Sequence, residues 1–82
     1  MLKNMLSKNI PNTEWRTRND NDNLKTCCTC RGERFTAKIT EGLEGYSYHV
    51  RGSNNIVYRS KVNNFDDLVA DMTTILNTLD ND

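Results

Sequence analysis

The spacing of apolar residues changes from two residues to about 3.6 near Asn64, and this change most constrains the fold. Before it, apolar and polar residues alternate through 33–40, 46–51 and 56–62, the pattern of strands with one buried and one exposed face. Polar, glycine-containing turns separate these stretches at 41–45 and 52–55. The sequence therefore predicts three antiparallel strands in a meander.

A C-terminal amphipathic helix is predicted over 64–80. Seven apolar residues fall on one helical stripe: Phe65, Leu68, Val69, Met72, Ile75, Leu76 and Leu79. Asn64 is placed to cap the helix, and Asp66 and Asp67 lie in its first turn, where the helix dipole favours negative charge. We expect this stripe to cover the apolar face of the sheet.

The N-terminal third of the chain carries weaker patterns. Apolar residues at 2, 5, 6 and 10 indicate a short helix within 1–11 that ends at Pro11. Segments 13–18 and 24–30 are expected strands joined by the polar turn 19–23, which would extend the sheet (13–62) to as many as five strands. The predicted fold class is thus α+β, with an antiparallel sheet of three to five strands and one covered face. Because 82 residues cannot supply two cores of about 50 residues each, one domain over 1–82 is expected.

Charge separates between the faces of this predicted sheet. If Trp15, Leu24, Cys28 and Cys30 point inward with the other apolar positions, the alternate positions point away from the helix. Nine of the eleven Lys and Arg residues then lie on the uncovered face together with His49: Arg16, Arg18, Lys25, Arg31, Arg34, Lys38, Arg51, Arg59 and Lys61. Glu14 is the one acid expected there, whereas five aspartates and no Lys or Arg follow Lys61. A net charge of zero therefore conceals a dipolar molecule.

These ten basic side chains are the predicted binding site. An uncovered sheet that presents Arg, Lys and Thr side chains suits phosphate groups or an acidic surface. We expect a non-enzymatic binding protein whose partner is nucleic acid or a protein complex that handles nucleic acid. The frequent asparagines suggest AT-rich coding sequence, and hence a phage or mobile-element regulator or inhibitor of host defence. In the alternative interpretation the basic face is merely solvated, and the protein acts through a strand edge, a helix or a homodimer.

Three strands followed by a helix that begins with an aromatic residue, Phe65, are similar in outline to the small arm-binding domains of tyrosine recombinases. The resemblance covers roughly the second half of the chain and involves no diagnostic motif. It implies that the sheet would contact DNA.

Cys27-x-x-Cys30 is the only metal-ligand pattern in the sequence. A zinc site needs four ligands, and only Cys28 and His49 remain, so zinc would require a dimer that shares the ion. Small strand residues explain the cysteines better, and we expect neither a metal nor another cofactor. His49, the only histidine, has no predicted catalytic partner.

Tyr46, Tyr48 and Tyr58 could form a base-stacking platform, but their alternation places them in the core. No apolar run reaches the roughly 18 to 20 residues of a membrane helix, and 1–11 lacks the apolar region of a signal peptide. A cytoplasmic protein with reduced thiols and no membrane partner is therefore expected.

Overall fold

Five antiparallel strands form one sheet in the order of the sequence, and two helices lie against it. The computed structural model describes the backbone of residues 1–20 and 25–80, and the side chains of these residues except 19, 20 and 25. The elements are α1 (Leu2–Asn9), β1 (Trp15–Asp20), β2 (Lys25–Arg31), β3 (Phe35–Gly42), β4 (Gly45–Gly52), β5 (Val57–Val62) and α2 (Phe65–Asp80). The predicted α+β class and meander are confirmed.

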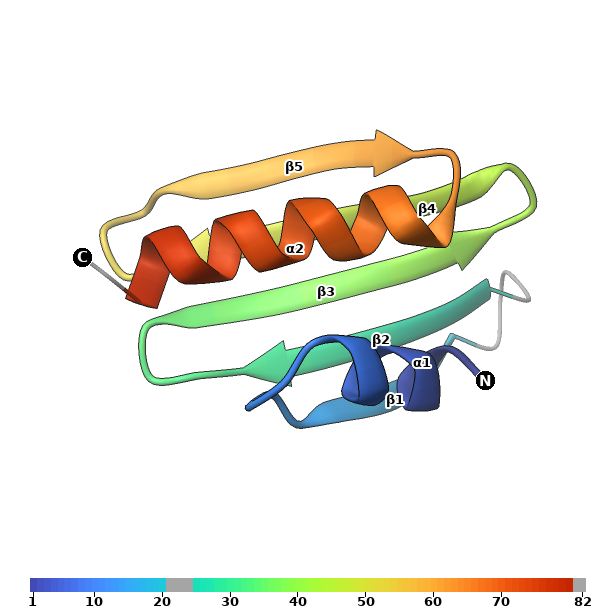
Figure 1. Ribbon diagram of the computed structural model, residues 1–82, viewed down its shortest axis with the longest axis horizontal. Helices are drawn as coiled ribbons and strands as arrows, with labels where there is room; N and C mark the ends of the chain where they lie inside the picture. Colours follow the sequence, from blue (N-terminus) through green and yellow to red (C-terminus); the bar gives the residue numbers. More distant parts are fainter. Residues whose placement is uncertain (21–24, 81–82) are drawn as a thin grey trace.

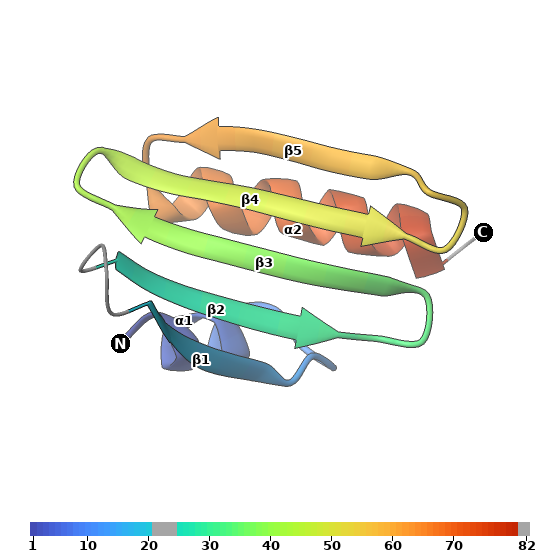
Figure 2. The same cartoon turned by 180° about the vertical axis from the view of Figure 1, so that it is seen from behind.

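Both helices lie on the same side of the sheet (Figure 1). The α1 helix contacts β1 and β2, and α2 contacts β4 and β5. The view from behind shows the strands in front of both helices, with no helix over this second face (Figure 2). The sequence predicted that α2 alone covers this face of the sheet. Two helices share it instead, because a five-stranded sheet is about 19 Å wide and therefore wider than one helix.

The strand register aligns side chains in rows that cross the sheet and alternate between its faces. Two of the rows that face the helices are Trp15, Cys30, Ala37, Val50 and Tyr58, then Thr17, Cys28, Ile39, Tyr48 and Ser60. The row between them, which faces away from the helices, consists of Arg16, Thr29, Lys38, His49 and Arg59. Since side chains alternate along each strand, the register assigns every strand position to one face.

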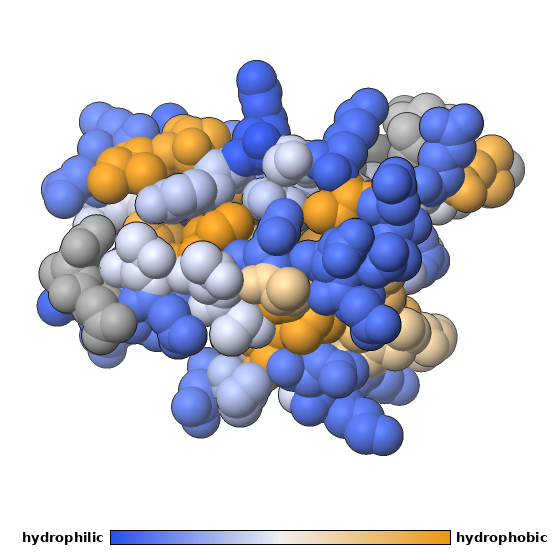
Figure 3. Space-filling model, turned by 45° about the horizontal axis from the view of Figure 1, so that its top comes forward, coloured by the Kyte–Doolittle hydropathy of each residue, from blue (hydrophilic) through white to orange (hydrophobic). Residues whose placement is uncertain are grey.

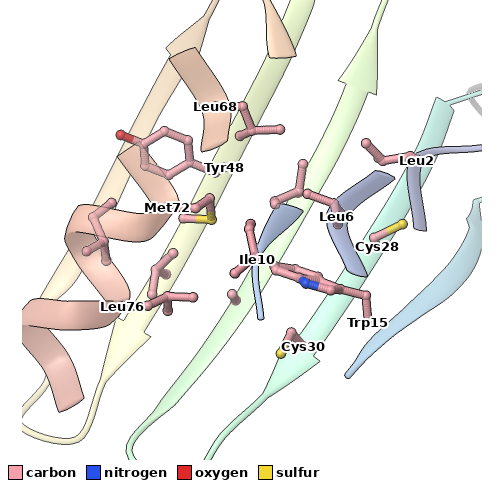
Figure 4. Packing of buried hydrophobic residues seen from close by; sticks show 14 of the residues in the cluster. Leu2, Leu6, Ile10, Trp15, Cys28, Cys30, Tyr48, Leu68, Met72 and Leu76 are labelled. Atoms are coloured by element: carbon pink, nitrogen blue, oxygen red, sulfur yellow. The ribbon is translucent and has the colours of Figure 1, made fainter. Parts of the chain in front are cut away.

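One continuous apolar cluster fills the space between the sheet and the helices (Figure 4). Its largest fully buried members are Leu6, Trp15, Cys28, Ile39, Val50, Leu68 and Met72. Trp15 extends from β1 and lies beside Ile10, while Leu2 and Leu6 of α1 lie near Cys28 (Figure 4). Each large apolar side chain contributes about 1.5 to 3 kcal/mol on burial, so both helices are held mainly by this cluster.

Polar contacts position α2 on the sheet. The side-chain oxygen of Asn64 accepts a hydrogen bond of 2.8 Å from the backbone N–H of Asp67, which confirms the predicted cap. The Tyr48 hydroxyl donates a 2.8 Å hydrogen bond to the Asp71 carboxylate. Burial, together with this hydrogen bond, raises the pKa of Tyr48. Asp71, one of the five aspartates after Lys61, thus holds α2 to β4.

Several element limits differ from the prediction. The first two strands begin and end one or two residues later than expected, and Leu24 lies outside the described residues. Met5 is exposed because only Leu2, Leu6 and Ile10, spaced four apart, can face the sheet from such a short helix. Ile56 is 40% exposed rather than inward. It precedes β5 in a turn where its carbonyl accepts a 2.7 Å hydrogen bond from the Gly52 N–H.

Candidate functional site

The helix-free side of the sheet, called here the open face, is strongly basic. Its cations with described side chains come from all five strands: Arg16, Arg18, Arg31, Lys38, Arg51, Arg59 and Lys61. His49 lies among them, and all eight side chains are exposed. No acid occupies an open-face strand position among the described side chains. The structure thus brings together eight of the ten residues that the sequence assigned to the site.

The other two predicted site residues lie elsewhere or are not described. Lys25 begins β2, but its side chain is outside the described part of the structure. Arg34 was expected on the strand and lies instead in the turn before β3. A 2.9 Å hydrogen bond from the Gly32 N–H to the Phe35 carbonyl closes that turn, so strand pairing starts only at Phe35. Glu14, the acid expected on this face, is an exposed residue just before β1.

Basic side chains flank His49 across the open face. Lys38 pairs with His49 on the neighbouring strand, and His49 pairs with Arg59 on the next. Side chains opposite each other in such pairs have Cβ atoms about 4.5 to 5.5 Å apart. None of these three forms an ion pair within the described part of the chain. A bound anion would supply the counter-charge that their described neighbours lack.

A shallow depression of about 440 Å³, called here the central hollow, lies on the open face over β3, β4 and β5. Lys38, His49, Arg59 and Lys61 line it together with the hydroxyl residues Thr40 and Ser47. Thr40 and Ser47 are half-buried, so short side chains form its floor and long cationic ones its rim. A second depression of about 430 Å³ continues towards the β3–β4 turn and shares Thr40, Ser47 and Lys61.

The hydroxyls of Thr40 and Ser47 were not singled out from the sequence. They lie seven residues apart on different strands, and only the pairing of β3 with β4 makes them neighbours. A sequence pattern that could predict them is a Ser or Thr in a strand with a basic residue two positions away, on the same face.

Cysteine side chains point to both faces of β2. Cys28 and Cys30 belong to the core cluster beneath the helices, whereas Cys27 faces the open side. Cys27 is nevertheless only 4% exposed, and its Sγ lies 3.4 Å from the Thr40 hydroxyl oxygen. Because Cys27 and Cys30 point in opposite directions from a regular strand, they cannot bind one zinc ion within the chain. The hypothesis of a zinc knuckle is wrong.

The two inward thiols are also poor metal ligands or nucleophiles. Burial raises the pKa of both Cys28 and Cys30, which favours the neutral thiol over the reactive thiolate. No group of three or more His, Cys, Asp or Glu side chains that could hold a metal occurs among the residues that the structure describes.

All six aromatic side chains lie in the core cluster or pack against it: Trp15, Phe35, Tyr46, Tyr48, Tyr58 and Phe65. The three tyrosines therefore belong to the helix side, as their alternation predicted. The open face has no Trp, Tyr or Phe side chain on which a nucleic-acid base could stack.

The strands β1 and β5 form the two edges of the sheet. At the β5 edge, Val57 is 47% exposed, and Ile56 is exposed beside it. Figure 3, which brings the β5 side forward, shows hydrophilic side chains over much of this surface with apolar atoms in separate patches between them. The edge thus combines free backbone groups with a small exposed apolar area.

A larger depression, about 710 Å³, lies between the β3–β4 turn and the start of α2. Its charged side chains are Glu41 and Glu44, and it contains no histidine, cysteine or cation. With two carboxylates and no cation, this lining does not attract anions. The central hollow is smaller than this depression, but its lining combines cations with hydroxyl groups.

No protein-family model, curated protein sequence or solved structure matches this chain. In the described part of the chain, neither helix has the length and apolar character needed to cross a membrane.

Proposed function

We propose that this protein is a non-enzymatic nucleic-acid-binding domain that holds the phosphate backbone of a duplex against its open face. One observation carries the proposal: seven cations and His49 project from one face, without an acid among the described open-face positions. Arg and Lys supply most phosphate contacts in protein–DNA complexes, and hydroxyl side chains and backbone N–H groups supply others. Thr29, Thr40 and Ser47 add such hydroxyls to the same face.

The side chains on the open face favour contacts to the backbone over contacts to bases. Binders of single strands stack bases on aromatic side chains, and the aromatic side chains of this protein lie on the other side of the sheet. The open face is also broad, because five strands about 4.8 Å apart span roughly 19 Å. A broad basic surface without Trp, Tyr or Phe suits the paired phosphate rows of a duplex, with little dependence on base sequence.

Solubility alone is a weaker explanation of this face. A solvated sheet face is equally soluble with acids and bases opposite each other, and such pairs contribute about 0.2 to 1 kcal/mol each. Here the described open-face strand positions hold seven cations and no acid, so no such pair forms among them. A face that forgoes this stabilisation is consistent with selection for an anionic ligand.

The salt dependence of duplex binding tests the proposal. With about four phosphate contacts, affinity for a 20-base-pair duplex is expected to fall about 100-fold between 50 and 200 mM NaCl. Fluorescence anisotropy of a labelled duplex measures this, and a duplex of scrambled sequence should give a similar curve. Poly-glutamate serves as a competitor that is anionic but lacks phosphate. Absence of binding at 50 mM salt, or an affinity that salt does not change, would contradict the proposal.

Binding along the phosphate backbone of a duplex gives this protein a biological role. A small domain that covers duplex phosphates excludes other proteins from the same stretch, and a regulator or an inhibitor of host defence can act in this way. The asparagine-rich composition favours a phage or mobile element as the source.

The free β5 edge favours a second candidate function, association through strand pairing. Exposed Ile56 and Val57 would be covered if β5 paired with β5 of a second copy. Multi-angle light scattering should then give twice the 9.5 kDa chain mass. Ile56→Asp with Val57→Asp should return the mass to that of a monomer. A monomer at every concentration would eliminate pairing between copies.

A further inference from the structure

We infer that the central hollow is a discrete site for one phosphate group, either a phosphodiester of the nucleic-acid backbone or a terminal or free phosphate. Where the phosphate belongs to nucleic acid, this inference rests on the proposed function. The affinity of the hollow for inorganic phosphate does not depend on it.

Two parallel rows of side chains define the site. Lys38, His49 and Arg59 form one row, and Thr40, Ser47 and Lys61 form the next. Neighbours within a row lie about 5 Å apart, and positions two residues apart along a strand are about 7 Å apart. These six side chains therefore surround an area of roughly 7 by 10 Å, which suits a single tetrahedral anion and its hydrogen bonds.

The hydroxyl groups in the floor of the hollow are placed to act as donors. The Ser47 hydroxyl has no hydrogen-bond partner within the described part of the chain. The Thr40 hydroxyl contacts the Sγ of Cys27, and either atom can donate in that contact. Phosphate oxygens at neutral pH act mainly as acceptors, so an occupied site would have Cys27 S–H donating to Thr40, and Thr40 donating to the phosphate. The buried Cys27 thiol thus orients a floor donor.

This combination of cations and hydroxyls sets the hollow apart from the rest of the open face. Arg16, Arg31 and Arg51 lie outside it, and so does the exposed hydroxyl of Thr36. Cations alone attract any anion, whereas half-buried hydroxyls between them select a group with several acceptor oxygens. Phosphate is the biological anion that carries both the charge and the acceptors.

Titration of the full-length chain with inorganic phosphate tests the site directly. We expect saturable changes in two-dimensional NMR spectra at the Thr40 and Ser47 amides and the His49 ring, with chloride at equal ionic strength as the control. Changes that follow ionic strength alone, or that are spread evenly over the open face, would overturn the inference.

Neutral substitutions separate the hollow from general charge attraction. Thr40→Val with Ser47→Ala removes both floor hydroxyls but no charge, and valine retains the strand preference of threonine. We expect about tenfold weaker duplex binding with an unchanged salt slope, because no cation is lost. Thr36→Val is the matched control on β3, with less than a twofold effect expected.

The outcomes for the hollow and for duplex binding can be told apart. Salt-dependent duplex binding that is equal in the double variant and in Thr36→Val would refute the hollow and leave the proposed function in place. Saturable phosphate binding without duplex binding would support the hollow and refute the proposed function. Tighter binding of a 5′-phosphorylated duplex than of its unphosphorylated form would assign the hollow to a terminal phosphate, and equal binding to an internal phosphodiester.

Discussion

Lys38→Glu combined with Arg59→Glu is expected to reduce affinity for duplex DNA by about 100-fold or more at 100 mM salt. Both cations flank His49 in one row of the open face. Each hydrogen bond between a charged side chain and phosphate contributes about 1.5 to 3 kcal/mol, and two such losses correspond to at least a 100-fold change in affinity. Repulsion between the new carboxylates and phosphate adds to this loss. Fluorescence anisotropy with the labelled duplex measures the effect.

Lys3→Glu combined with Lys8→Glu is the matched control. It changes the net charge by the same amount, but both lysines are exposed on α1, on the helix side of the molecule. If only the distribution of charge matters, this variant should bind within about threefold of the original protein, an effect of less than 1 kcal/mol. Equal losses in the two variants would show that net charge, rather than the open face, governs binding.

Trp15→Ala is expected to lower the free energy of unfolding by about 3 to 5 kcal/mol. Trp15 is 1% exposed and lies in the core cluster with Leu6 and Ile10. A domain of 82 residues has a total stability of only about 4 to 12 kcal/mol, so the loss would leave much of the protein unfolded. Urea unfolding followed by far-ultraviolet circular dichroism measures this without the tryptophan signal.

Trp15→Phe provides the comparison for that loss. The indole N–H of Trp15 is buried and has no hydrogen-bond partner among the residues that the structure describes. Phenylalanine keeps most of the apolar contact and removes this unsatisfied donor, which itself costs about 1 to 3 kcal/mol. The Phe variant should therefore be clearly more stable than the Ala variant. Similar urea midpoints for the Ala variant and the original protein would show that the β1 side of the core contributes little.

The alternation of side chains along the strands could be interpreted without coordinates. Because the period of two is a property of the extended chain itself, it correctly assigned Lys38, His49 and Arg59 to one face and Tyr48 to the other. The α2 helix was equally predictable, since its apolar stripe and its Asn64 cap are both local features.

Other features were decided by contacts between distant segments. An eight-residue helix is marginal on its own, so α1 is stabilised by docking on β1 and β2, which no local pattern specifies. Hairpin geometry likewise excluded Arg34 from β3, through the Gly32–Phe35 hydrogen bond. Alternation is weak around the cysteines, so the sequence alone permits a zinc knuckle. The regular pairing of β2 with its neighbours puts Cys27 and Cys30 on opposite faces.

The sequence by itself determined which side chains share a face of the sheet, because that depends only on their parity along a strand. Tertiary structure alone decided which of them are neighbours across strands, because that depends on register. The central hollow is of the second kind: Thr40, Ser47 and Lys61 are far apart in the chain and adjacent only through strand pairing. The turns and the shared core select that register, since a slip by one residue would expose the apolar side chains of the whole strand.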